Sequence, residues 1–189
     1  MLVSAAQASE AELTRLKSVI DGAIDAIYAD PAASSSQKQA QVRSVIEKEY
    51  DLNVIIRRAI GRNWNLMSGA EQEEVLKLVK QLVVKAYVEG MNGKSRPGVS
   101  FGEIVTISDK RMEIPCAIRM DEQTINVLYR LGRMRTGWQI YDIVAEDISV
   151  VSNYRDQIDD HFRRGSGAEL IEKLRELLTK EDLNEEITL

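Results

Sequence analysis

The spacing of hydrophobic residues changes near the middle of the chain. Up to Pro97-Gly98, apolar residues recur every three or four positions, which is the pattern of amphipathic helices. This spacing predicts a helix over residues 10–29, a second that ends near Tyr50, a short third one over 51–61 and a long fourth over 68–90. The N-terminal half of the chain is therefore expected to be helical.

After Pro97-Gly98, apolar and polar residues alternate, which is the period of half-buried β-strands. Short polar turns separate four such runs, and connections of this length join antiparallel neighbours. Helical spacing returns over residues 150–164 and 170–178. This order predicts an α+β fold, with helices before and after a curved antiparallel sheet of about four strands packed on one face of it. The predicted strands are 99–107, 111–120, 123–131 and 138–145.

The predicted helix over residues 68–90 has the widest apolar surface. It begins with a capping box, Ser68-Gly69-Ala70-Glu71. Leu76, Val84 and Val88 lie beside its main apolar row and widen the stripe beyond what one simple contact requires. Such a helix can complete a filled core or border a cavity, and residue types alone do not distinguish the two.

Composition limits the possible functions. A chain of 189 residues fits one domain, and a net charge of −5 disfavours nucleic acid as a partner, because phosphate binding needs a basic surface. Ala6-Gln7-Ala8 has the small-x-small pattern of a signal-peptidase site. We interpret residues 1–9 as an export-signal remnant or disordered start, 10–179 as a single domain, and 180–189 as an acidic tail. No apolar run approaches the ~18 residues of a membrane span.

Few residues are candidates for chemistry. Cys116 is the only cysteine, so an internal disulfide is excluded, and a buried thiol is its default interpretation. His161 is the only histidine and lies beside, rather than within, the apolar stripe of its helix. Asp142 interrupts an apolar strand, and a buried carboxylate needs a partner, which Arg155 or Arg130 could supply. We predict no catalytic residue, no metal site and no cofactor, and we expect Asp142 and Arg155 to form a structural ion pair.

Several short motifs, taken together in their order and spacing, resemble the MlaC (toluene-tolerance) family of periplasmic phospholipid carriers. The resemblance covers roughly residues 45–178. One departure is Asp147, which stands where the family pattern usually has glycine, so the turn before Ile148 is expected to differ. The motifs are Tyr50-Asp51, Arg58-Ala59-Ile60-Gly61, Trp64, Ser68 with Glu71-Gln72, Tyr129-Arg130-Leu131, Trp138 with Ile140-Tyr141-Asp142, Ile148-Ser149-Val150-Val151 and Asn153-Tyr154-Arg155.

This resemblance implies an NTF2-like or cystatin-like shape with a lipid cavity between helices and sheet. It also implies an exported periplasmic protein that is not an enzyme and carries phospholipid as its cargo. Its partners would be an inner-membrane ABC transporter complex, through that complex's substrate-binding component, and an outer-membrane lipoprotein complex. The exchange would maintain the lipid asymmetry of the outer membrane.

The predicted cavity is lined by apolar residues of the long helix and the sheet, with a few from the following helix closing one end. Aliphatic walls hold acyl chains without orientation-specific hydrogen bonds, so they suit a carrier that must also release its cargo. The predicted lining residues are Val79, Val83, Tyr87, Val105, Ile107, Ile114, Cys116, Ile118, Val127, Tyr129, Ile140, Ile143, Ile148, Val151 and Tyr154.

Three alternatives remain open at this point. The cargo could be a hopanoid or another hydrophobic molecule. An NTF2-like enzyme would need an acid–base pair in the pocket, for which Asp142 with Tyr129 or Tyr154 is the candidate. A helical adaptor would instead have a filled core and an exposed apolar patch.

Overall fold

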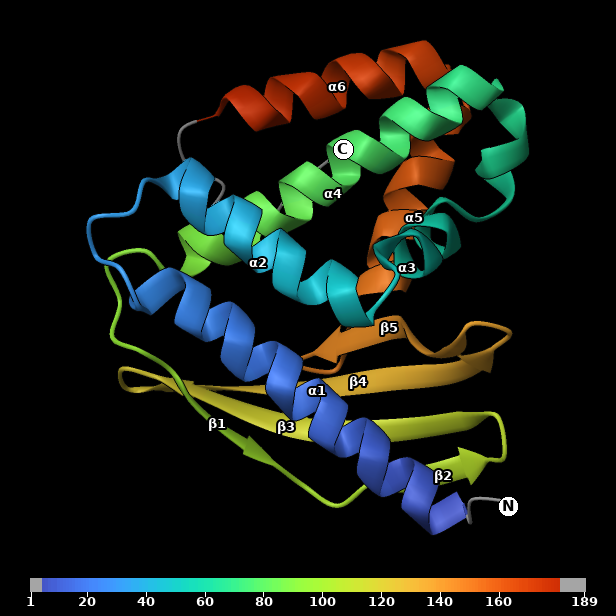
Figure 1. Ribbon diagram of the computed structural model, residues 1–189. Coiled ribbons are helices and arrows are strands. Elements are labelled where there is room, and N and C mark those ends of the chain that lie inside the picture. The colour runs from blue at the N-terminus through green and yellow to red at the C-terminus, as the bar shows by residue number, and fades with distance from the viewer. Residues whose placement is uncertain (1–4, 181–189) are drawn as a thin grey trace.

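The computed structural model describes residues 5–180 and has a sheet with all of its helices on one side (Figure 1). The first helix lies across the sheet, and the sixth lies farthest from it (Figure 1). The helices are α1 (Ala5–Tyr28), α2 (Ser35–Glu49), α3 (Leu52–Ile60), α4 (Gly69–Met91), α5 (Val150–Phe162) and α6 (Gly167–Thr179), with the 3-10 helix η1 (Gly61–Leu66) after α3.

The sheet is antiparallel throughout and follows the order β1-β3-β4-β5-β6, with β2 also paired to β3. Its centre is the predicted meander, in which Ile114, Tyr129 and Ile143 lie side by side on the three long strands. The α+β class with an antiparallel sheet is confirmed. The strands are β1 (Gly98–Phe101), β2 (Val105–Ser108), β3 (Arg111–Met120), β4 (Gln123–Met134), β5 (Gly137–Ala145) and β6 (Ile148–Ser149).

The sheet has six strands where about four were predicted, and Pro115 explains one of the two additions. The predicted strand over 99–107 is divided into β1 and β2, both of which pair with β3. The carbonyl of Pro115 accepts a hydrogen bond from the amide of Gly102 at 2.9 Å, but proline has no N–H to continue the ladder on that side. The chain therefore leaves the sheet after Phe101 and rejoins it at Val105.

The other addition is β6, which follows a tight turn after β5. Glu146 and Asp147 have φ values of 46° and 64°, so both lie in the left-handed region. The turn is held against the neighbouring strand β4, because the Glu146 carboxylate accepts a hydrogen bond from the amide of Asn126. Asp147 is tolerated at the position of the expected glycine because aspartate adopts this conformation more readily than most residues.

The structure describes the two ends of the chain only in part. Helix α1 begins at Ala5, so residues 5–9, interpreted as part of an export-signal remnant or disordered start, are helical. Residues 1–4 lie outside the described residues, and so does the predicted acidic tail after Lys180.

Two separate hydrophobic cores hold the helices, and α4 belongs to both. One face of it packs with α3, α5 and α6 through Val75, Leu78 and Leu82. The opposite face packs with α1, α2 and the sheet through Val84, Val88 and Met91. The wide apolar surface of this helix is thus explained by two contacts on different sides rather than by one.

Asp142 fixes the start of α5 against the sheet. Its carboxylate accepts hydrogen bonds from the Ser149 hydroxyl at 2.8 Å and the Val151 amide at 3.2 Å, and it pairs with Arg130 at 3.1 Å. The predicted partner Arg155 instead donates to the carbonyl of Arg58 from Nε at 3.2 Å. Arg130 lies directly across from Asp142 on β4, whereas Arg155 is more than a turn into α5, so the partner of the carboxylate is Arg130.

A double-mutant cycle will test this assignment. We expect Asp142→Ala to lower the free energy of unfolding by about 2–4 kcal/mol, because it leaves a buried amide and a partly buried arginine without their acceptor. In the double variant with Arg130→Ala, the loss of unfolding free energy should be smaller than the sum of the two single losses by about 1 kcal/mol. In the double variant with Arg155→Ala, the loss should equal the sum of the single losses to within about 0.5 kcal/mol. Urea unfolding measures both cycles, and coupling confined to Arg155 would contradict the structure.

Candidate functional site

An apolar cavity of about 280 Å³ lies between the helices and the sheet. Helices α1, α2, α3 and α4 and strands β4 and β5 all contribute to its wall, so it occupies the junction of the two cores. The lining is aliphatic except for three tyrosines and one aspartate. It consists of Leu16, Val19, Ile20, Ala23, Ile46, Tyr50, Asp51, Leu52, Ile55, Val83, Val84, Tyr87, Val127, Tyr129, Ile140 and Ile143.

The cavity reaches the surface between the start of α3 and the middle of α4. Asp51 and Val83 are the exposed members of its lining, and Val83 exposes 45% of its surface. The Asp51 carboxylate caps α3 by accepting a hydrogen bond from the Asn53 amide at 2.9 Å. An apolar interior thus meets water beside one carboxylate that is already engaged in a helix cap.

The tyrosines stay neutral over the physiological pH range. Burial raises the pKa of Tyr87 to about 12. Burial also raises the pKa values of Tyr50 and Tyr129 well above the ordinary range of a phenol. The cavity therefore offers hydroxyl donors but no phenolate charge.

Six of the residues predicted from the sequence line the cavity. They come from the long helix and from the face of the sheet that the helices cover. Whether they contact a lipid stays a prediction. They are Val83, Tyr87, Val127, Tyr129, Ile140 and Ile143.

Six predicted residues lie on the sheet but outside the cavity wall, and apart from Cys116 four of them are on β2 and β3. Val105 and Ile107 are on the short strand β2, where they are 48% and 55% exposed. Val105 pairs with Glu113, so it lies on the face of the sheet opposite to Ile114. Ile114 is fully buried in the core beneath α1, and Ile118 is half-buried between Val99 and Ile125.

The other predicted residues lie outside the cavity wall for different structural reasons. Cys116 is buried opposite Val127, and Val79 packs in the core that α4 shares with α6. Val151 is buried at the start of α5, where its amide meets Asp142, and Tyr154 is half-buried on the same helix. Ile148 is 58% exposed on β6. Residues 148–154 therefore do not close the cavity.

The sequence analysis missed the helices that form the other half of the wall. Leu16, Val19, Ile20 and Ala23 of α1 form an apolar stripe that is visible in the sequence, but the spacing does not say that this helix crosses the sheet. Ile46, Tyr50, Leu52 and Ile55 come from the α2–α3 corner. Their positions depend on how the chain turns at Asp51.

The candidate acid–base pair is not assembled in the cavity. Asp142 is absent from its lining and is held by Arg130, Ser149 and Val151. Among residues 5–180 there is no group of three or more histidine, cysteine, aspartate or glutamate side chains that could hold a metal ion. Within the same residues, none of the helices combines the length and hydropathy that crossing a bilayer requires.

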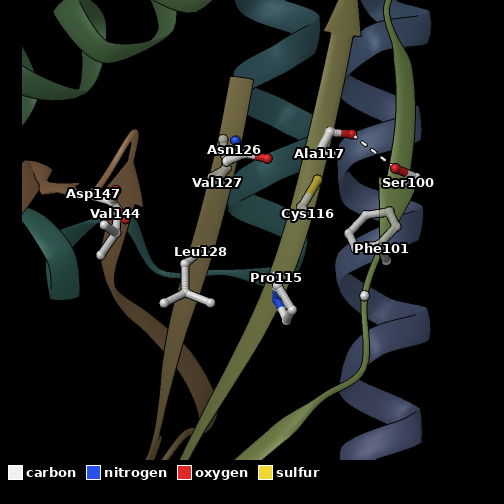
Figure 2. Close-up of a pocket in the computed structure, with 11 residues that line it drawn as sticks. Ser100, Phe101, Pro115, Cys116, Ala117, Asn126, Val127, Leu128, Val144 and Asp147 are labelled. Carbon is white, nitrogen blue, oxygen red and sulfur yellow. Dashed lines mark hydrogen bonds between the residues drawn. The ribbon is translucent and has the colours of Figure 1, made fainter. Parts of the chain in front are cut away.

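A second hollow, of about 410 Å³, lies on the face of the sheet away from the helices (Figure 2). Pro115, Leu128 and Val144 form its apolar part, and they alternate along their strands with the residues that face the helices. Ser100, Asn126 and Asp147 add polar groups from the neighbouring strand and turn. Although it is larger, this hollow is open and partly polar, so the cavity beneath the helices is the better site for an apolar ligand.

The buried thiol offers a chemical test of the sheet's inner face. Burial raises the pKa of Cys116 to about 11 from an ordinary value of 9.0, so at pH 8 its thiolate fraction is about a hundredfold lower than in the unfolded chain. The neutral thiol favours folding below pH 9, and this contribution disappears as the pH rises through 11. We expect iodoacetamide at pH 8 to alkylate the native protein at least about a hundredfold more slowly than the urea-unfolded protein, and rates within about tenfold of each other would contradict the burial.

Comparisons with known proteins agree with this architecture. A solved structure from Ralstonia solanacearum, described as a phospholipid-binding protein in complex with a phospholipid, superposes with a TM-score of 0.74. It is 19% identical and covers 87% of this chain and 95% of its own. No curated protein matched the chain. The family model described as MlaC protein matches residues 17–176, which is most of the sequence. On that match, the chain belongs to the MlaC family.

Proposed function

We propose that this protein is a periplasmic phospholipid carrier that holds acyl chains in the cavity between its helices and its sheet. It would move lipid between an outer-membrane lipoprotein complex and the substrate-binding component of an inner-membrane ABC transporter complex, and so maintain the lipid asymmetry of the outer membrane. The observation that carries the proposal is the aliphatic cavity that reaches the surface at Val83. Membership of the MlaC family and the likeness to a phospholipid-binding protein support it.

The energetics of lipid transfer explain why such a wall suits a carrier. Each CH₂ group removed from water contributes about 0.8 kcal/mol, so two acyl chains represent roughly 20 kcal/mol or more. A lipid monomer therefore rarely crosses water by itself. A carrier needs a cavity about as favourable as the bilayer, and not much more favourable, because otherwise it would not release its cargo. A wall of leucine, isoleucine and valine meets this requirement.

The cavity must widen to receive a whole phospholipid. Its volume of about 280 Å³ is at the lower end of the ~300–1,000 Å³ that is typical of ligand pockets. Val83, Val84 and Tyr87 line it from α4, the helix that both cores share. We infer that widening takes place where the two cores meet.

The acidic surface is consistent with a carrier that must leave each membrane. With a net charge of −5, the protein is repelled by anionic headgroups rather than held by them. Weak binding to anionic vesicles that does not fall when salt is added is what this interpretation requires, because salt screens repulsion as well as attraction.

Mass spectrometry of an organic extract of the purified protein is the direct test. We expect about one phospholipid per protein, above a matched blank extract. The protein meets lipid in the cell membranes, and an apolar cavity is more favourable when acyl chains fill it than when it is empty. Vesicles that contain fluorescent phospholipid provide the second measurement, namely uptake by the delipidated protein. A hopanoid in the extract would correct the cargo, and protein that is clean and also takes up no lipid would contradict the proposal.

A matched pair of variants will locate the lipid. Val83→Trp places a bulky ring where the cavity opens, so we expect lipid uptake to fall at least about fivefold with little change in stability, since Val83 is 45% exposed. Ile107→Trp makes the same kind of change at a residue that is 55% exposed on β2 and outside the cavity wall. Uptake should stay within about twofold of the wild-type protein for this control. Equal loss in both variants would place the lipid elsewhere.

A further inference from the structure

The cavity has three hydroxyl groups in a wall that otherwise serves only apolar contact. Tyr50 follows α2, Tyr87 lies on α4 and Tyr129 lies on β4, so three separate elements each bring one tyrosine to the same space. Phenylalanine would fill the same volume. The hydroxyls therefore need an explanation other than packing.

Tyr50 presents the clearest case. The residue is 3% exposed, and its hydroxyl is buried without a hydrogen-bond partner among the described residues. The ring has a structural role, because the Arg15 guanidinium lies over it at 4.2 Å, but a phenylalanine ring would serve that role as well. A buried hydroxyl without a partner destabilises the fold, so its presence indicates a partner that arrives with the ligand.

Tyr28, in the same layer of helices, is a tyrosine whose hydroxyl has partners in the protein. Its hydroxyl lies within hydrogen-bond distance of the carbonyl oxygens of Met91, Lys94 and Ser95, at 3.2, 3.3 and 3.1 Å. It is outside the cavity wall. The tyrosine that faces protein is thus satisfied by protein, whereas Tyr50 is not.

The three tyrosines share one low-polarity space. Burial raises the pKa of Tyr129, and the nearby Cys116, Tyr87 and Tyr50 raise it further. Because all three tyrosines stay neutral, they are hydrogen-bond donors without charge. Their natural complement is a neutral acceptor oxygen, since an anionic one would lose its hydration on entering this space.

We propose that the hydroxyls of Tyr50, Tyr87 and Tyr129 form a hydrogen-bonding site for a neutral oxygen atom carried within the apolar part of the lipid. This inference rests on the proposed carrier function and adds a preference to it. Two lipid groups present such an oxygen, namely the ester carbonyl at the start of each acyl chain and a hydroxyl group on the chain itself. Tyr50 is the specificity-determining residue of the site, because its hydroxyl has no other role.

Competition between matched lipids tests the site. Delipidated protein is incubated with vesicles that contain equal amounts of a diester phospholipid and its diether analogue, with the same headgroup and chain lengths, and the bound lipids are then extracted and counted by mass spectrometry. A second arm pairs a phospholipid with chain hydroxyls against its plain counterpart. We expect the lipid with the recognised oxygen to be preferred at least about fivefold in one arm, which is the factor that one neutral hydrogen bond contributes, and that arm identifies the group.

Single-atom variants assign the preference to the tyrosines. Tyr50→Phe should reduce it to below about twofold without lowering the melting temperature, because the removed hydroxyl has no partner in the protein. Tyr129→Phe and Tyr87→Phe should reduce it in the same way, and they serve if Tyr50→Phe does not fold. The control, Tyr28→Phe, should lower the melting temperature and leave the preference unchanged.

The outcomes separate the two proposals. Equal binding of both lipids in both arms by the wild-type protein overturns the hydroxyl site while the carrier function stands. A preference that survives in all three cavity variants overturns it as well. Absence of bound lipid in every arm overturns the carrier function itself, and the total lipid counted in the same extracts reveals this case.

Discussion

The structure depends on one helix having to pack against two cores at once. One face of α4 packs with α3, α5 and α6, and the opposite face packs with α1, α2 and the sheet. The cavity lies where the two cores meet, with Val83 and Tyr87 on its wall, so the site is formed by the packed helices and sheet.

The sheet supports this arrangement because its inner and outer faces have different roles. On the inner face, Tyr129 and Ile143 border the cavity, while Ile114 beside them is fully buried beneath α1. The start of α5 is secured by the carboxylate of Asp142, which binds the arginine across from it and the amide of Val151. A polar group that interrupts an apolar strand therefore has a structural explanation outside the cavity.

The proposed function and the proposed tyrosine site address different aspects of the same problem. Aliphatic contact gives affinity in proportion to buried area and does not distinguish one acyl chain from another. Neutral hydroxyls such as that of Tyr50 add a directional contact that only a lipid with a suitably placed oxygen completes. Because each hydrogen bond contributes modestly, the preference it creates leaves release possible.

The sequence by itself determined the helices and the central strands, because helix and strand periodicity depend on local geometry. Strand β3 and the short helix before Gly61 occur where the spacing and the capping Asp51 predicted them. The pairing of the strands decided which of their faces meets the helices, and it placed Tyr129 beside Ile143. Only the tertiary structure decided that α1 and Tyr50 border the cavity, and that Asp142 pairs with Arg130 rather than Arg155. These features depend on contacts between residues far apart in the chain, which no local pattern encodes.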